Sequence, residues 1–173
     1  MKTILLIFIM IGICSNTVSA KKVTKKSKLN VDLCVNSKKL IRAVIQSENP
    51  CRNPHDVGDN HLRHKAYGLL QIRKPYLDDV NQIAGKKEIR RLWGKNKLTV
   101  QDMKSQKKAE WAFRVYMSYY GKVYKHKTRK VPTIEVYARM HNGGPVGWKK
   151  KSTKKYGKAV VRYVQKNRVR KYG

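Results

Sequence analysis

Acidic residues are scarce in this sequence. Only 10 of its 173 residues are Asp or Glu, against 41 Lys and Arg, and the formal net charge is +31. Such an excess predicts polyanionic surroundings, such as bacterial envelopes, nucleic acid, sulfated glycans or anionic lipid, and binding that weakens as salt rises. The charge identifies no reaction, because a solvated basic surface that serves solubility or acid tolerance explains it equally well.

Long apolar runs are also rare. The main one, residues 5–13, lies between Lys2 and the small residues 18–20, which is the pattern of a secretory signal peptide. An uncleaved anchor is the alternative. No later run approaches the length of a membrane span, so the chain after Ala20 is expected to be soluble and secreted.

Cysteine is nearly absent. The chain has three, and Cys14 would leave with the signal peptide. Cys34 and Cys51 remain, and in a secreted protein two cysteines most simply form a disulfide. Two free thiols are the alternative.

Several signatures of cofactor chemistry are missing as well. The sequence has no Cys/His spacing of the zinc type, no Gly-rich phosphate loop and no Gly-x-Ser-x-Gly elbow. No metal or other cofactor is therefore expected.

What the sequence does contain is helical periodicity. Residues 21–30 have the composition of a disordered basic arm, and residues 31–173 are expected to form one domain that ends in a basic tail. No alternating pattern supports more than a short β-hairpin, so the fold class predicted is mostly α. Apolar positions predict helices that end at residue 48, begin at residue 75, span 107–124, begin at residue 133 and begin near residue 152.

Glu48 stands out among the few carboxylates. At ~100° per residue it falls within the apolar arc that Leu40, Ile41, Val44 and Ile45 form on the first helix. Burial raises the pKa of a carboxyl group, and an acid still protonated near neutral pH is what general-acid catalysis requires. A buried structural ion pair with an arginine is the alternative interpretation.

The positions of the other carboxylates narrow the search for a partner. Asp56 and Asp59 lie on the loop after Glu48, which can fold back over the end of the helix. Glycoside cleavage uses an acid to protonate the leaving oxygen, and a second carboxylate or a positioned water on the far face of the sugar. Glu48 with Asp56 or Asp59 fits this chemistry. The rest have surface, helix-start or capping interpretations: Asp32, Asp78, Asp79, Glu88, Asp102, Glu110 and Glu135.

Three segments resemble the lysozyme and lytic-transglycosylase superfamily. They are the helix that ends in Glu48, the AYGLLQI motif of residues 66–72, and YARMHNGGPVG of residues 137–147. The last is similar to a segment of invertebrate-type lysozymes and small bacterial muramidases, and the resemblance spans about residues 38–165. It implies a lysozyme-like α+β domain with a catalytic cleft. It also implies cleavage of bacterial peptidoglycan between N-acetylmuramic acid and N-acetylglucosamine, with Glu48 as general acid.

The resemblance leaves the second carboxylate open. Asp56 precedes Val-Gly, as in the invertebrate type, whereas Asp59 follows Val-Gly, as in the bacterial relatives. Asn49 replaces the usual serine after the catalytic glutamate, and the dense cysteine framework of the invertebrate enzymes is missing. Two reactions therefore stay open. Hydrolysis is the one expected, and a lytic transglycosylase that leaves 1,6-anhydro ends is the alternative.

The same segments contain candidates for sugar binding. A tyrosine face can stack on a sugar, and glycine lets the backbone approach one, although core packing, a turn or a helix cap explains such residues equally well. A third function stays open beside the two enzymes: a non-catalytic cationic protein that binds membranes or polyanions. The chain is expected to be monomeric. The candidates are Tyr67, Gly68, Gln71, Tyr137, His141, Asn142 and Gly143.

Overall fold

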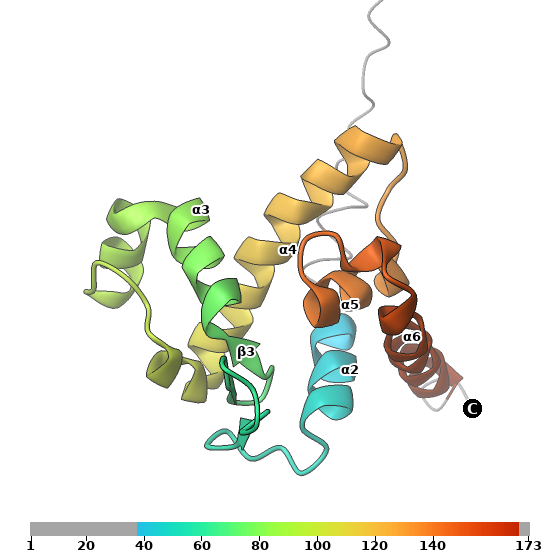
Figure 1. Cartoon of the computed structure of the whole chain (residues 1–173), viewed down its shortest axis with the longest axis horizontal. Helices are drawn as coiled ribbons and strands as arrows, with labels where there is room; N and C mark the ends of the chain where they lie inside the picture. Colours follow the sequence, from blue (N-terminus) through green and yellow to red (C-terminus); the bar gives the residue numbers. More distant parts are fainter. Residues whose placement is uncertain (1–37, 170–173) are drawn as a thin grey trace, which may run out of the picture.

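The computed structural model describes residues 38–169 of the chain. The expected signal peptide, the basic arm and Cys34 lie outside these residues, so the disulfide stays a prediction; Cys51 is exposed. Within the described part no helix is long and apolar enough to cross a bilayer. Figure 1 shows the helices α2 (Lys38–Glu48), α3 (Lys74–Trp93), α4 (Gln106–Thr128), α5 (Ile134–Gly143) and α6 (Lys154–Val169), to which three short 3-10 helices are added: η1 (Val100–Lys104), η2 (Gly147–Lys149) and η3 (Lys151–Thr153).

The mostly helical class is confirmed, and the sheet is larger than expected. Three antiparallel strands, β1 (Val57–Gly58), β2 (Ala66–Tyr67) and β3 (Ile72–Arg73), pair in that order. The expectation of at most a hairpin was wrong. Each strand has two residues, and alternation cannot be detected over so short a stretch.

The core lies where α2 meets the other helices. The apolar arc expected on α2 is confirmed, because Leu40, Ile41, Val44 and Ile45 are all buried, and Ala43 beside the arc is buried as well. In Figure 1 this helix stands in the middle of the molecule between α4 and α6, and it contacts α6. The burial of one face of α2 therefore brings the end of that helix, and with it the carboxyl group of its last residue, to the edge of the core.

The α3 helix is interrupted by glycine. Gly85 has φ +73°, a left-handed conformation that breaks the helical run, and Gly94 ends the helix in the same region of φ. The segment after Gly85 turns away from the first half and is rich in Lys and Arg. Only the first half of α3 contributes to the cleft beside α2.

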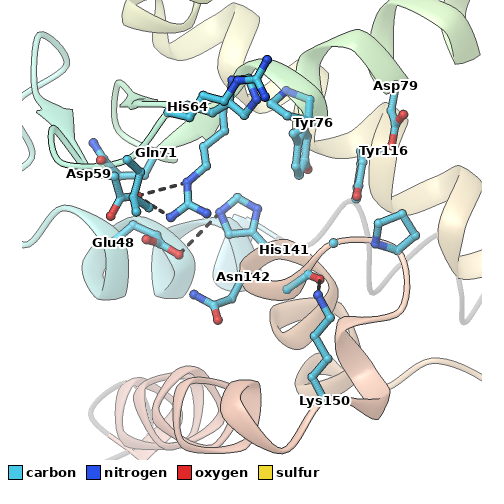
Figure 2. Close-up of a pocket in the computed structure, with 17 residues that line it drawn as sticks. Glu48, Asp59, His64, Gln71, Tyr76, Asp79, Tyr116, His141, Asn142 and Lys150 are labelled. Carbon is cyan, nitrogen blue, oxygen red and sulfur yellow. Dashed lines mark hydrogen bonds and ion pairs between the residues drawn. The ribbon is translucent and has the colours of Figure 1, made fainter.

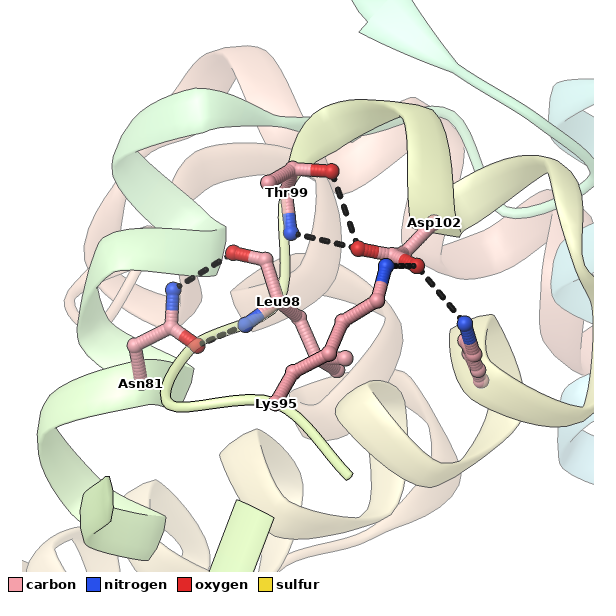
Figure 3. A network of polar contacts seen from close by, with 6 residues as sticks. Asn81, Lys95, Leu98, Thr99 and Asp102 are labelled. Atoms are coloured by element: carbon pink, nitrogen blue, oxygen red, sulfur yellow. Dashed lines mark hydrogen bonds and ion pairs between the residues drawn. The ribbon is translucent and has the colours of Figure 1, made fainter. Parts of the chain in front are cut away.

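A buried carboxylate holds the loop after α3. Asp102 of η1 is 5% exposed, and it accepts hydrogen bonds from the Nζ atoms of Lys95 and Lys108, each at 2.7 Å, and from the backbone N and Oγ1 of Thr99, each at 2.9 Å. Figure 3 shows these bonds. The capping interpretation of Asp102 is confirmed, because Thr99 and Asp102 form a capping box.

The η1 helix, which this network holds in place, packs against the sheet, and the closest approach is at Gly68. A Cβ atom on Gly68 would lie 2.1 Å from the carbonyl oxygen of Met103 in η1, and Gly68 has φ +72°. Both the close approach and the left-handed backbone therefore require glycine at this position. Gly68 serves the packing of η1 under the strands, and it does not line the cleft.

Asp102→Ala is expected to lower the free energy of unfolding at pH 7 by about 2 kcal/mol, the combined order of a lost helix cap and two partly exposed ion pairs. Burial disfavours the charge, but hydrogen bonds from Lys108, Lys95 and Thr99 outweigh it and hold the pKa of Asp102 well below its usual value. Because the pKa of Asp102 is lower in the folded chain than in the unfolded chain, where it is near 3.8, the charged carboxylate stabilises the fold above pH 3.8. This stabilisation is lost as pH falls from 3.8 toward the pKa of the folded chain.

Urea unfolding of the wild type and of Asp102→Ala is measured at pH 7 and pH 3, and the difference in their free energies of unfolding should be smaller at pH 3. Glu110→Ala is the control, because its ion pair with Arg114 lies within one helix and contributes about 0.5 kcal/mol at most. An Asp102 variant that loses no more stability than the control would contradict the role of the network.

Candidate functional site

A cleft of about 570 Å³ opens beside the end of α2. Its walls come from α2, the loop and strands of the small sheet, the first turns of α3, the middle of α4, and the turn after α5 (Figure 2). Segments far apart in the chain therefore meet at this cleft. The lining residues are Glu48, Asp59, Leu62, Arg63, His64, Gln71, Arg73, Pro75, Tyr76, Asp79, Tyr116, His141, Asn142, Gly143, Gly144, Pro145 and Lys150.

Glu48 lies at the wall of this cleft as the last residue of α2. Its side chain is 18% exposed. Burial raises the pKa of the Glu48 carboxyl; the Tyr156 hydroxyl and the Arg73 guanidinium oppose this shift, and the charge of Asp59 adds to it. The carboxyl group consequently stays protonated to higher pH than a solvated glutamate, as a general acid must.

The alternative of a structural ion pair for Glu48 finds no support. No Lys or Arg nitrogen of the described residues lies within 4.0 Å of its carboxylate, and its one contact of that kind is with Nε2 of His141 at 3.7 Å. The Tyr156 hydroxyl is buried beside Glu48 and lowers the pKa of its carboxyl group. Within the described part of the chain, Glu48 is thus a desolvated acid that forms no ion pair with a Lys or Arg.

His141 is a neutral group behind the cleft wall. Its side chain is 3% exposed, and Nε2 lies 2.9 Å from the carbonyl oxygen of Leu70. Because a carbonyl only accepts, Nε2 carries the proton and donates it. Burial lowers the pKa of His141 to about 4; the bond to Leu70 opposes this shift and Arg73 adds to it. His141 therefore connects α5 to the turn before β3 and carries no charge near neutral pH.

This burial predicts a loss of stability in mild acid. The pKa of His141 is about 4 in the folded chain against its usual value of 6.5, so the unfolded chain takes up its proton first as pH falls. The stabilisation is present above pH 6.5 and is lost between 6.5 and 4, which corresponds to about 3 kcal/mol.

The measurement is urea unfolding of the wild type and His141→Gln at pH 7 and pH 4. The difference between the two proteins should shrink by about 3 kcal/mol between these pH values. His126→Gln, an exposed position on α4, is the matched control and should show no such change. A constant difference for His141→Gln would contradict the shift.

Of the two candidates for a second carboxylate, only Asp59 lines the cleft. It follows β1 with φ +56° and is ion-paired with Arg73 of β3, whose Nε lies 3.1 Å from Oδ2. Asp56 lies outside the lining; its backbone carbonyl accepts a hydrogen bond from the Gly68 amide at 3.0 Å. The loop thus brings Asp59 and not Asp56 to the same cavity as Glu48.

Four of the seven residues expected to bind sugar line the cleft: Gln71, His141, Asn142 and Gly143. Gln71 has φ +47° and donates from Nε2 to the carbonyl of Gly68 at 2.8 Å, so it also braces the turn.

The other three expected residues do not reach the cleft lining. Tyr67 is half-buried in β2, and Gly68 packs under η1. Tyr137 is fully buried on the inner face of α5, where its ring lies against Gly121. Packing accounts for the position of Tyr137, and a left-handed turn with close packing accounts for Gly68.

Comparison with known proteins rests on structure. No family model matches the sequence, and no curated protein shows significant similarity to it. The crystal structure of Tapes japonica lysozyme matches with a TM-score of 0.55 at 22% identity, over 72% of this chain and 87% of that one. A crystal structure of Aeromonas hydrophila PliI in complex with Meretrix lusoria lysozyme matches with a TM-score of 0.54 at 23% identity, over 73% of this chain and 88% of that one. The chain has a lysozyme-like fold.

The expected lysozyme-like α+β architecture is thereby confirmed. At these identities the likeness establishes the fold and leaves the chemistry to the cleft itself. No cluster of three or more metal-ligating side chains occurs within residues 38–169. The acidic side chains that line the cleft are Glu48, Asp59 and Asp79.

The lysozyme-like cleft also contains residues that were not predicted from sequence. Tyr76 stacks on Tyr116 with ring centroids 3.7 Å apart, and Tyr120 donates a hydrogen bond to Asp79 at 2.8 Å. Tyr76, Asp79 and Tyr116 line the cleft. One signal was available, because Tyr76 and Asp79 are three residues apart and share a face of α3. Asp79 was instead explained by its place near the start of that helix, where a carboxylate complements the helix dipole.

Proposed function

We propose that this chain is a secreted enzyme that cleaves the bond between N-acetylmuramic acid and N-acetylglucosamine in bacterial peptidoglycan. The observation that carries the proposal is the carboxyl group of Glu48, which is desolvated, lacks a Lys or Arg partner among the described residues, and lines a cleft with Asp59. The lysozyme-like fold, shared with the crystal structure of Tapes japonica lysozyme, supports the proposal.

In this proposal Glu48 protonates the glycosidic oxygen as the bond to the leaving sugar breaks. Asp59 acts on the opposite side of the sugar, where it activates water or stabilises the positive charge that develops on the ring. Arg73 holds Asp59 through Oδ2 and so positions it relative to Glu48. His141 supports the turn that carries Gln71 and takes no part in proton transfer near neutral pH.

Digestion of purified peptidoglycan, followed by mass spectrometry, tests the proposal. Hydrolysis is expected, and it leaves reducing muramic acid ends that have gained one water per cut. Products lighter by one water would carry 1,6-anhydro ends and would make the chain a lytic transglycosylase, which needs only the acid. Failure to release any muropeptide would overturn both enzymatic forms of the proposal.

A second candidate function is favoured by charge alone. With a formal net charge of +31, the chain suits a monomeric cationic protein that acts on envelopes by binding anionic polymers or membranes. This function requires no carboxylate in the cleft. Substitution of Glu48 by glutamine therefore separates the two.

A further inference from the structure

One side of α6 carries cations without any acidic counterpart. At ~100° per residue, Lys154, Lys155, Lys158, Arg162 and Lys166 fall within an arc of roughly 120°, and each is exposed. We call these five residues the α6 stripe. None of the ion pairs within the described residues involves α6. The stripe is therefore a row of solvated charges of one sign.

This arrangement is unfavourable for the helix by itself. Lys154, Lys158, Arg162 and Lys166 follow one another at intervals of four residues, and like charges at that interval repel. Lys154 and Lys155 also begin the helix, where the macrodipole disfavours cations. A bound polyanion would replace these repulsions with attractions.

The stripe begins beside the cleft. Lys150 lines the cleft and donates from Nζ to the carbonyl of Gly143 at 2.7 Å (Figure 2). The chain then passes through η3 (Lys151–Thr153) directly into α6. Lys154, Lys158, Arg162 and Lys166 are spaced about 6 Å from one to the next along the helix axis, so they form a track for an extended chain.

We propose that the α6 stripe binds the phosphodiester-linked polyol polymers of bacterial walls and so holds the enzyme on wall that carries them. This inference rests on the proposed function for the nature of the target. Such a polymer has one phosphate per short polyol unit and no base or hydrocarbon chain, and it is attached to the glycan that the cleft is proposed to cut.

The composition of the exposed arc favours this partner over two others. The arc contains no aromatic side chain on which a nucleic acid base could stack, because Tyr156 and Tyr163 are half-buried and pack against the core. Between residues 154 and 166 the arc contains no apolar side chain that could insert into a lipid bilayer, and Ala159 beside it is too small to do so. The stripe therefore offers charge alone.

The test compares two variants with the same loss of charge. One is Lys154→Gln, Lys158→Gln, Arg162→Gln and Lys166→Gln together. The control carries glutamine at four exposed lysines that form no ion pair among the described residues: Lys86, Lys87, Lys97 and Lys122. The first three lie on α3 or just after it, and Figure 1 shows α3 at the other side of the molecule from α6; Lys122 lies on α4.

Binding of purified polyol-phosphate polymer is measured by titration calorimetry between about 50 and 200 mM salt, the range over which such contacts weaken most visibly. Each lost phosphate contact should lower the slope of log K against log salt by about 0.7. We therefore expect the slope of the α6 variant to fall by about 3, with binding at low salt weaker by at least about tenfold, while the control keeps most of its affinity. Equal losses in both variants, or no binding by the wild type, would overturn the proposal.

Two further measurements keep the outcomes separable. On peptidoglycan stripped of the polymer, the α6 variant should cleave at the wild-type rate, and failure of all proteins to cleave it would count against the proposed function alone. A single-stranded oligonucleotide and anionic vesicles are titrated in parallel, and tighter α6-dependent binding of either would overturn the choice of partner. Should the fourfold variant misfold by circular dichroism, Lys158→Gln with Arg162→Gln should give about half the change in slope.

Discussion

Glu48→Gln should reduce the release of reducing ends from peptidoglycan by at least about a hundredfold, the usual contribution of a general acid. Glutamine keeps the size of the side chain, but it has no acidic proton to give to the leaving oxygen. The substitution therefore removes the chemistry and leaves the cleft in place. The rate is measured on purified peptidoglycan at the pH optimum of the wild type.

The matched control is Glu110→Gln on α4, an acid of the surface that pairs with Arg114 and does not line the cleft. It should retain the wild-type rate. If Glu48→Gln clears cell walls at full strength, the enzymatic hypothesis fails and the cationic, non-catalytic function replaces it.

Glu48→Gln is also predicted to stabilise the protein at pH 7, whereas most substitutions destabilise a protein. The folded chain raises the pKa of Glu48, chiefly through burial, so protonation favours the folded state. Stability is then lost as pH rises from the unfolded value of 4.5 through the folded one. Glutamine carries no charge, and Glu48→Gln should unfold at higher urea concentration than the wild type at pH 7. Below about pH 4 the two midpoints should converge.

Asp59→Asn should lower the rate of cleavage by about a hundredfold, whereas Asp56→Asn should leave it within a factor of about two. The reason is placement. Asp59 lines the cleft with Glu48, and Asp56 lies outside it. Asparagine keeps the shape of the side chain and removes the negative charge that would activate water or stabilise the transition state. Initial rates of both variants on the same peptidoglycan give the comparison, and full activity in Asp59→Asn would remove that residue from the mechanism.

Arg73→Gln separates a chemical role of Asp59 from a structural one. Asp59 and Arg73 form an ion pair across the sheet, and the loss of either residue frees the other. If Asp59 served only to anchor Arg73, the two substitutions would reduce the rate equally. The proposed mechanism instead predicts that Arg73→Gln lowers the rate less than Asp59→Asn does, because the carboxylate of Asp59 remains although Arg73 no longer positions it.

Local features of the chain were predictable from sequence because they depend on neighbours in the same element. The apolar arc of α2 and the place of Glu48 on it follow from helical spacing alone, and the structure buries all four apolar residues of that arc. The α5 helix ends in its HNGG segment, where glycine favours a stop. Thr99 and Asp102 have the three-residue spacing of a capping box, and they form one.

Features that join distant segments were not predictable in this way. Tyr137 and Tyr116 look alike in the sequence and both are buried, yet only Tyr116 contributes to the lining of the cleft. The three strands of the sheet are too short to leave an alternating pattern, and their pairing depends on how the intervening loops close.

The sequence by itself determined that one carboxyl group would be desolvated at the end of an amphipathic helix, because helical geometry sets which side chains share a face. Only the tertiary structure decided which aspartate joins it. Asp56 and Asp59 are three residues apart on one loop, and the pairing of β1 with β2 and the ion pair to Arg73 place Asp59 in the cleft. Such a choice depends on contacts between elements, and those contacts exist only once the chain has folded.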